Sequence, residues 1–241
     1  MKTEDLKRGI HDGIPIALGY VSVSFTFGLM AVSAGMKWWQ ALLISMTNVT
    51  SAGQFAGLDI MIAGGSLVEM ALTQFVINLR YALMSISLSQ KVDRGFDMLT
   101  RLATGFGVTD EIFAVSVSRN KSISKYYMAG LIGVAYIGWA VGTAAGAVLG
   151  GALPDIVSNA LGIAIYGMFL AIIIPQARND SRCLKVIIIA VVLSCCFKWI
   201  PVINKLSSGF VIIICAVVAS TIGAVFYPIV EEDEENTGGD E

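Results

Sequence analysis

Long apolar runs alternate with short polar clusters along almost the whole chain. Six runs are long and apolar enough for a membrane helix, which takes about 20 residues; they are residues 14–34, 67–90, 126–150, 155–176, 184–200 and 208–228. Two further runs, 40–63 and 102–118, contain polar residues, so each is a full span, a broken helix or a re-entrant hairpin. The pattern predicts an all-α polytopic membrane bundle with about six full spans plus two broken or re-entrant segments.

Composition supports a membrane setting. Hydrophobic residues make up 56% of the chain and charged residues 14%, and the mean hydropathy is +0.75, whereas about 25% of residues are charged in a typical soluble domain. We therefore assign residues 1–230 to a single transmembrane domain in the lipid bilayer and residues 231–241 to an acidic, disordered C-terminal tail. The net charge of −2 gives no reason to expect nucleic acid as a partner.

The positions of Lys and Arg favour one topology, because cytoplasmic loops carry an excess of both residues. If the two interrupted runs return to their own sides and the N-terminus is inside, the basic residues left outside are Lys37, Lys198 and Lys205. If both runs cross instead, the basic residues of 91–101 also move outside and the bias weakens. We expect the first arrangement, with both termini cytoplasmic; the alternative with eight crossings also keeps both termini inside.

The interruption of run 40–63 is the polar, small-residue stretch 47–54, TNVTSAGQ. Non-helical backbone at membrane depth is tolerated only where it is buried in protein or lines a watery cavity. If the helix breaks near residues 51–53 and restarts at Gln54, the amides of Ala52, Gly53 and Gln54 and the dipole of the second half-helix form a site for a carboxylate. The alternative is a helix interface in which the small residues only permit close packing.

Arg80 is the most unusual residue, because it lies near the centre of the run 67–90. A charged side chain there costs about 2.5–3.5 kcal/mol on insertion scales and normally faces a polar cavity or a partner. We expect Arg80 to line a substrate pathway, with Asn78 at its edge. The alternative is a structural ion pair with a carboxylate such as Asp59 or Glu69, although Glu69 lies about 16 Å along the same helix.

Two adjacent acids, Asp110 and Glu111, interrupt the run 102–118. Thr109 can cap a half-helix that starts at Asp110, and the helix dipole then favours both acids in the first turn. A functional alternative is that one carboxylate binds a substrate ammonium or carries a proton, as membrane carboxylates do in transporters. The sequence leaves both interpretations open.

The span that starts at residue 126 carries a stripe of glycines at every fourth position: Gly138, Gly142, Gly146 and Gly150. Such a stripe lets another helix approach closely. We interpret it as a helix-packing face, with the facing helix supplied either by this chain or by a partner. His11 is the only histidine and the four cysteines show no metal-ligand spacing, so we expect no metal site and no cofactor.

Four short motifs, in order and at their spacing, resemble AzlC-type large subunits of bacterial branched-chain amino acid exporters (the LIV-E family) over about residues 9–228. The motifs are Gly13-Ile14-Pro15, Ser51-Ala52-Gly53-Gln54-Phe55, Asn78-Leu79-Arg80-Tyr81 and Thr109-Asp110-Glu111-Ile112-Phe113. The resemblance implies export of L-valine and similar neutral amino acids across the bacterial inner membrane. It also implies a small, separately encoded AzlD-type membrane subunit as partner.

Resemblance and residue chemistry together suggest how a zwitterionic amino acid binds. The amides of residues 52–54 and Arg80 take the carboxylate, Asp110 or Glu111 takes the ammonium, and Phe25, Phe55 and Phe113 surround the aliphatic side chain. Opposed broken segments that meet near the midplane build such sites in many secondary transporters, although blocks 14–90 and 126–200 show no convincing similarity to each other.

The chain contains no P-loop for ATP hydrolysis, so a proton gradient is the expected driving force. Two alternative functions remain: an intramembrane enzyme with Asp110 and Glu111 as acid and base, and a structural subunit of a membrane complex.

Overall fold

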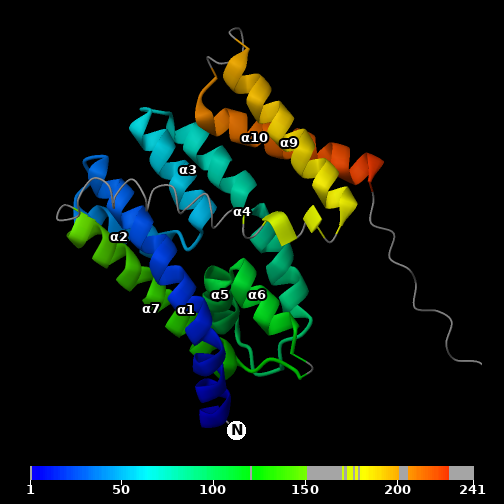
Figure 1. Cartoon of the computed structure of the whole chain (residues 1–241). Helices are drawn as coiled ribbons and strands as arrows, with labels where there is room; N and C mark the ends of the chain where they lie inside the picture. Colours follow the sequence, from blue (N-terminus) through cyan, green and yellow to red (C-terminus); the bar gives the residue numbers. More distant parts are fainter. Residues whose placement is uncertain are drawn as a thin grey trace, which may run out of the picture.

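The structure is a computed structural model that describes residues 2–119, 121–150, 170, 173–175, 177–178, 180–200 and 206–227. Within these residues the regular secondary structure is helical, apart from one isolated β-bridge. The helices (Figure 1) are α1 (Lys2–Ser33), α2 (Trp38–Thr47), α3 (Ser51–Ile62), α4 (Leu67–Ser89), α5 (Met98–Gly107), α6 (Asp110–Val117), α7 (Lys125–Leu149), α9 (Ser181–Trp199) and α10 (Ser208–Phe226). The expected all-α membrane bundle is therefore confirmed.

Of the described helices, α1, α4, α7 and α10 are long and apolar enough to cross a membrane. This is fewer than the six spans expected from the sequence. Most of run 155–176 and the whole expected tail 231–241 lie outside the described residues. Run 184–200 forms α9, which is not apolar enough to count as a membrane span, because Arg182, Lys185 and Lys198 lie within its 19 residues.

The closest helix pair is α1 and α7, and the glycine stripe of α7 lies between them. A Cβ atom added at Gly138 would lie 2.7 Å from the carbonyl oxygen of Ala17, and one added at Gly142 would lie 2.5 Å from that of Val21. Both distances are shorter than a carbon–oxygen contact permits, so only glycine allows this approach. The helix that faces the stripe is therefore α1 of the same chain.

Both interrupted runs are pairs of short helices. The two runs give α2 and α3, of 10 and 12 residues, and α5 and α6, of 10 and 8 residues. At a rise of about 1.5 Å per residue, none of these helices reaches across a hydrocarbon core of about 30 Å.

Each pair also returns to the end of the molecule from which it enters. The bridge between Val92 and Ile123 joins the chain before α5 to the chain after α6, and the Asp93 amide donates to the Ile123 carbonyl at 2.9 Å. Near the other end, Ala41 of α2 and Leu58 of α3 lie in one apolar cluster. The two pairs enter from opposite ends in Figure 1, which matches the arrangement favoured by the positions of Lys and Arg.

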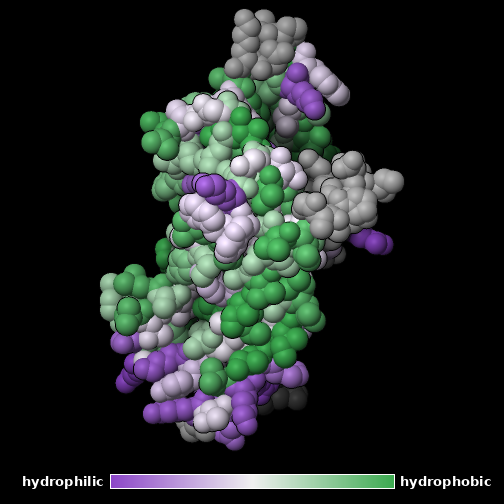
Figure 2. Space-filling view, turned by 90° about the vertical axis from the view of Figure 1, so that its left-hand side faces the viewer, coloured by the Kyte–Doolittle hydropathy of each residue, from purple (hydrophilic) through white to green (hydrophobic). Residues whose placement is uncertain are grey.

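The polar end of the molecule holds the N-terminus and the connections on either side of the α5–α6 pair. Lys91 Nζ donates to the Val117 carbonyl at 2.6 Å, and Ser124 Oγ donates to Asp5 Oδ2 at 2.7 Å. Hydrophilic residues gather at this lower end in Figure 2, below a largely apolar surface. The basic residues of these segments thus share one side of the molecule.

This geometry predicts which positions share a side of the membrane. In a cysteine-free background, Arg94→Cys and Lys121→Cys should both resist an impermeant thiol reagent added outside the cell, and Lys37→Cys should react with it. The reason is that the bridge at residues 92 and 123 brings the first two positions to one end, while residue 37 begins the pair that enters from the other end. Opposite labelling of positions 94 and 121 would rule out the re-entrant α5–α6 pair.

Candidate functional site

A cavity of about 860 Å³ lies where the two broken pairs meet the long helices. Ligand pockets for small molecules usually occupy roughly 300–1,000 Å³. The polar part of its wall is formed by Tyr20, Ser22, Thr50, Ser51, Arg80, Tyr81, Thr109, Asp110 and Glu111. The apolar part includes Ile16, Val23, Val49, Val76, Ile77 and Trp139. Residues from α1, α3, α4, α6, α7 and α10 thus converge on one space.

The first half-helix at the cavity is α3, and Thr50 is its N-cap. The Thr50 backbone is extended, with φ −145° and ψ 120°, and its Oγ1 accepts from the Gly53 amide at 3.5 Å. The Gln54 amide donates to the Thr50 carbonyl at 3.0 Å. The helix therefore starts at Ser51 rather than at the expected Gln54, and the first-turn residues on the cavity wall are Ser51 and Ala52.

The second half-helix at the cavity is α6, which begins as the sequence predicts. Thr109 is extended and accepts from the Ile112 amide at 3.4 Å, so Asp110 and Glu111 occupy the first turn. Tyr20 of α1 reaches across to this cap. Its hydroxyl lies 2.5 Å from Thr109 Oγ1 and donates to Glu111 Oε2 at 2.7 Å. The Glu111 carboxylate is therefore anchored at the helix N-terminus, where the dipole favours a negative charge.

An ion pair on the cavity wall joins α4 to α6. Arg80 Nη1 lies 2.9 Å from Asp110 Oδ2, with 44% and 34% of the two side chains exposed. Arg80 Nη2 also donates to the Tyr81 hydroxyl at 3.0 Å. Because both partners remain partly exposed to the cavity, each keeps polar atoms that a bound molecule can reach.

The other expected site residues are not among those that line the cavity. Gln54 is fully buried, and its Oε1 accepts from Ser45 Oγ at 3.2 Å. The Phe55 ring packs edge-on against Phe27, with centroids 5.5 Å apart. Asn78 donates to Gln74 Oε1 at 3.2 Å. The structure thus brings together Ala52, Arg80, Asp110 and Glu111 at the cavity. The remaining expected residues pack against other helices or hydrogen-bond to neighbouring side chains away from it.

The expected aromatic pocket of Phe25, Phe55 and Phe113 is also absent from the cavity lining, where aliphatic residues and Trp139 stand instead. The part of the chain that the structure describes contains no cluster of three or more His, Cys, Asp or Glu side chains that could bind a metal ion.

Sequence reasoning missed a pair of equivalent tyrosine–threonine contacts. Tyr81 of α4 donates to the N-cap Thr50 of α3 at 3.2 Å, just as Tyr20 of α1 contacts the N-cap Thr109 of α6. The cap of α3 is thus bonded to α4, the long helix before the α5–α6 pair, and the cap of α6 is bonded to α1, the long helix before the α2–α3 pair. A detectable signal was the repeated Val-Thr dipeptide, residues 49–50 and 108–109, directly before each half-helix.

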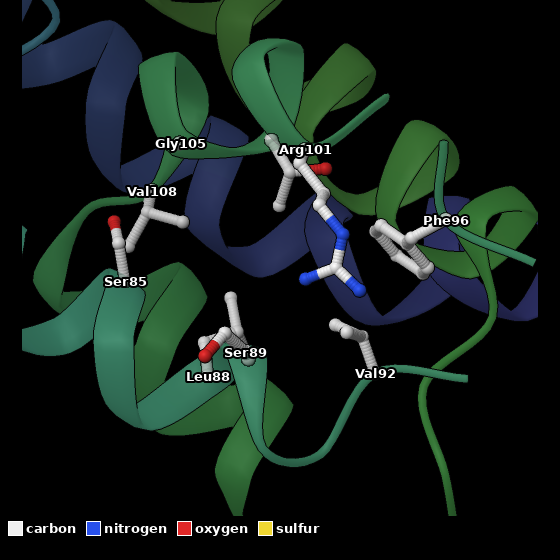
Figure 3. A pocket seen from close by; sticks show the side chains of 9 residues that line it. Ser85, Leu88, Ser89, Val92, Phe96, Arg101, Gly105 and Val108 are labelled. Atoms are coloured by element: carbon white, nitrogen blue, oxygen red, sulfur yellow. The ribbon is translucent and has the colours of Figure 1, made fainter. Parts of the chain in front are cut away.

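A second pocket lies at the C-terminal end of α4 and is much smaller, at about 60 Å³. Figure 3 shows the Arg101 side chain extending into it between Ser89, Val92 and Phe96. A space of this size accommodates a few water molecules. The larger cavity is therefore the candidate substrate site.

The residues that build this cavity fall almost entirely within a recognised sequence family. The model of the family described as AzlC protein matches residues 15–153. An uncharacterized membrane protein of Archaeoglobus fulgidus is 32% identical over 180 residues, which cover 74% of this chain and 78% of that protein. The chain belongs to the AzlC family. This confirms the resemblance drawn from the four sequence motifs.

A relative from Escherichia coli matches a larger share of the chain. The inner membrane protein YgaZ of Escherichia coli K12 is 28% identical over 203 residues, which cover 81% of this chain and 83% of that protein. An uncharacterized membrane protein of Helicobacter pylori 26695 is 29% identical over 102 residues, or 42% of this chain and 44% of that protein. No solved structure matches the chain. Membership of the AzlC family fits a transporter role for this membrane protein.

Proposed function

We propose that this chain is the large subunit of a secondary transporter that exports branched-chain amino acids such as L-valine. Transport runs across the inner membrane, is driven by a proton gradient and involves a small AzlD-type membrane subunit. The name of the Escherichia coli relative, an inner membrane protein, supports the location. The observation that carries the proposal is the Arg80–Asp110 ion pair on the wall of a large cavity, between the N-termini of two half-helices.

A zwitterionic amino acid matches this arrangement of charges. Its carboxylate accepts hydrogen bonds from the N–H edge of the Arg80 guanidinium and from the first-turn amides of Ser51 and Ala52, where the dipole of α3 favours an anion. Its ammonium binds the carboxylate of Asp110, and Glu111 lies beside it in the first turn of the second half-helix. The substrate thus inserts into an existing ion pair and replaces one charge contact by two, which keeps every charge in the cavity paired.

The apolar wall suits an aliphatic side chain. Ile16, Val23, Val76 and Ile77 line the cavity alongside the charged groups. Burying a valine or leucine side chain against such residues contributes about 1.5–3 kcal/mol. Charged or strongly polar side chains would lose their hydration without gaining a partner there. The cavity therefore selects neutral, apolar amino acids.

The enzyme alternative is less well supported. Asp110 faces an arginine, and the Glu111 carboxylate accepts from the Tyr20 hydroxyl. The only histidine of the chain, His11, lies exposed in the first part of α1, so the cavity offers these carboxylates no histidine-activated nucleophile. A purely structural subunit would not need a cavity large enough for an amino acid.

The proposal is tested by counterflow in proteoliposomes. The full chain, purified with its small membrane subunit, is reconstituted into vesicles loaded with unlabelled L-valine. We expect labelled L-valine to enter faster than into protein-free vesicles, with inhibition by L-leucine but not by L-lysine. Vesicles that carry the Arg101→Gln variant serve as a matched control, because Arg101 lines the small pocket and not the cavity. Absence of valine counterflow in complexes of normal yield would contradict the proposal.

A further inference from the structure

Glu69 stands apart from the other acids of the chain. It is the one charged side chain in the described structure that is buried, with 3% of its surface exposed. It lies in the first turn of α4, the helix that also carries Arg80. At about 1.5 Å per residue the two lie about 16 Å apart along the helix axis. Glu69 is therefore separate from the charge cluster of the cavity.

The Glu69 carboxylate contacts the start of α10. Its Oε1 accepts from the Gly209 amide at 3.0 Å. A Cβ atom at Gly209 would lie 2.6 Å from that Oε1 and 2.7 Å from Thr73 Oγ1. Glu69 Oε1 and Thr73 Oγ1 thus both face the first turn of α10. The start of α10, coloured orange, lies beside the start of α4 in Figure 1. Thr73 is fully buried, and its hydroxyl has no hydrogen-bond partner in the described structure.

The charge of Glu69 has no cationic partner among the described residues. The helices packed around Glu69 contribute few other titratable side chains. These are Asp59 of α3, which is exposed, and Cys215 of α10. On the other side, Glu69 Oε2 faces the turn at Gly65. The ionised carboxylate is therefore stabilised mainly by the Gly209 amide and by the positive ends of the α4 and α10 dipoles, because it lies in the first turn of α4 and faces that of α10. Buried ionised carboxylates without such compensation are strongly disfavoured.

We propose that Glu69 is the proton-binding site that couples transport to the proton gradient; this rests on the proposed export function. Ionised Glu69 holds the start of α10 against α4 by a charge-assisted hydrogen bond. Protonation removes the charge and weakens that bond, and the new O–H finds an acceptor in Thr73 Oγ1. One proton enters the carboxyl group from one side of the membrane and leaves it toward the other.

Protonation at Glu69 reaches the substrate cavity through α10. Ala216 of α10 lines the cavity and lies about 10 Å along the helix from Gly209. A change in how the start of α10 is held therefore alters the position of one cavity wall. A neutral acceptor such as glutamine would also hold the Gly209 amide, by a weaker bond but without placing a charge in an apolar environment, so anchoring alone does not require a glutamate.

The test separates coupling from anchoring. Glu69→Gln keeps an oxygen for the Gly209 amide but does not titrate. In proteoliposomes with the complete complex, we expect Glu69→Gln to retain valine counterflow and to lose accumulation driven by an imposed pH gradient. Asp59→Asn, which removes an exposed carboxylate from the neighbouring α3, is the matched control and should retain both activities.

A Glu69→Gln complex that accumulates valine in a pH gradient as the wild type does would overturn the assignment. If that variant does not fold, Thr73→Val decides, because it keeps the carboxylate and removes only the acceptor of the protonated form. Its driven transport should then need a lower pH, and an unchanged pH dependence would overturn the assignment. Wild-type counterflow without a response to pH would reject Glu69 as the coupling site together with the proton gradient as the driving force, and would leave valine transport by this chain intact. No wild-type counterflow would reject both.

Discussion

Gly146→Ala is expected to destabilise the protein, although alanine is normally the better helix former. A Cβ atom at Gly146 would fall on the Phe25 carbonyl group of α1, 2.7 Å from its carbon atom. The obstacle is backbone, which cannot turn aside as a side chain does, so α1 and α7 must separate. Overpacking of this kind costs about 1–3 kcal/mol and occasionally more. The measurement is the midpoint of thermal unfolding in detergent micelles.

Gly133 on the same helix provides the matched control. A Cβ atom added there meets nothing within 4 Å. Gly133→Ala should therefore stabilise the helix by about 0.5–1 kcal/mol, the usual advantage of alanine over glycine. The same glycine-to-alanine substitution is thus expected to lower the stability of the protein on one face of α7 and to raise it on another. Equal melting temperatures for the two variants would show that the α1–α7 contact is not as close as the structure places it.

The broad architecture followed from the sequence because membrane burial leaves few alternatives. The backbone must be satisfied within each segment, so long apolar runs form helices, and the runs that begin at residues 14, 67, 126 and 208 match α1, α4, α7 and α10. The glycine stripe predicted a close helix contact, since the spacing alone defines a smooth face. The identity of the facing helix needed the structure, because α1 meets α7 across a long sequence separation.

The candidate site was harder to predict, because caps and tertiary contacts decide it. Thr109 was recognised as a cap, and α6 begins where expected. Thr50 was placed inside a polar stretch with several possible breaks, and its cap bond to Gly53 moves the start of α3 to Ser51. Tyr20 and Tyr81 gave no sequence signal as single residues, because a tyrosine near a helix centre is also a common packing residue.

The apolar part of the site was expected to be aromatic, and its lining is mostly aliphatic. Phenylalanines next to a motif attract attention, but the spacing of residues along a helix does not determine which side chains of a face reach the cavity. Phe55 follows the cavity-lining Ala52 by three residues yet packs on Phe27. Phe113 similarly lies in the apolar cluster of α1, α6 and α7. Which face of each half-helix meets the cavity depends on packing between segments far apart in the chain.

Arg80→Gln is expected to weaken L-valine binding about 10- to 100-fold. This corresponds to the roughly 1.5–3 kcal/mol that a hydrogen bond to a charged group contributes. The stability loss should be smaller, about 1 kcal/mol or less, because the Arg80–Asp110 pair is partly exposed and such pairs contribute little to folding. Calorimetry of L-valine binding alongside thermal unfolding separates the two effects. Arg101→Gln, in the small pocket, should change neither.

A charge-reversed pair completes the test. Arg80→Asp combined with Asp110→Arg restores opposite charges at the same two positions. If the pair only holds α4 against α6, the double variant recovers stability and L-valine binding together. If Arg80 binds the substrate carboxylate, stability returns but affinity does not, because the cation now sits at the N-terminus of α6 and an anion faces the amides of α3, where the dipole opposes it. Recovery of L-valine affinity in the reversed pair would therefore reject the substrate-binding role of Arg80.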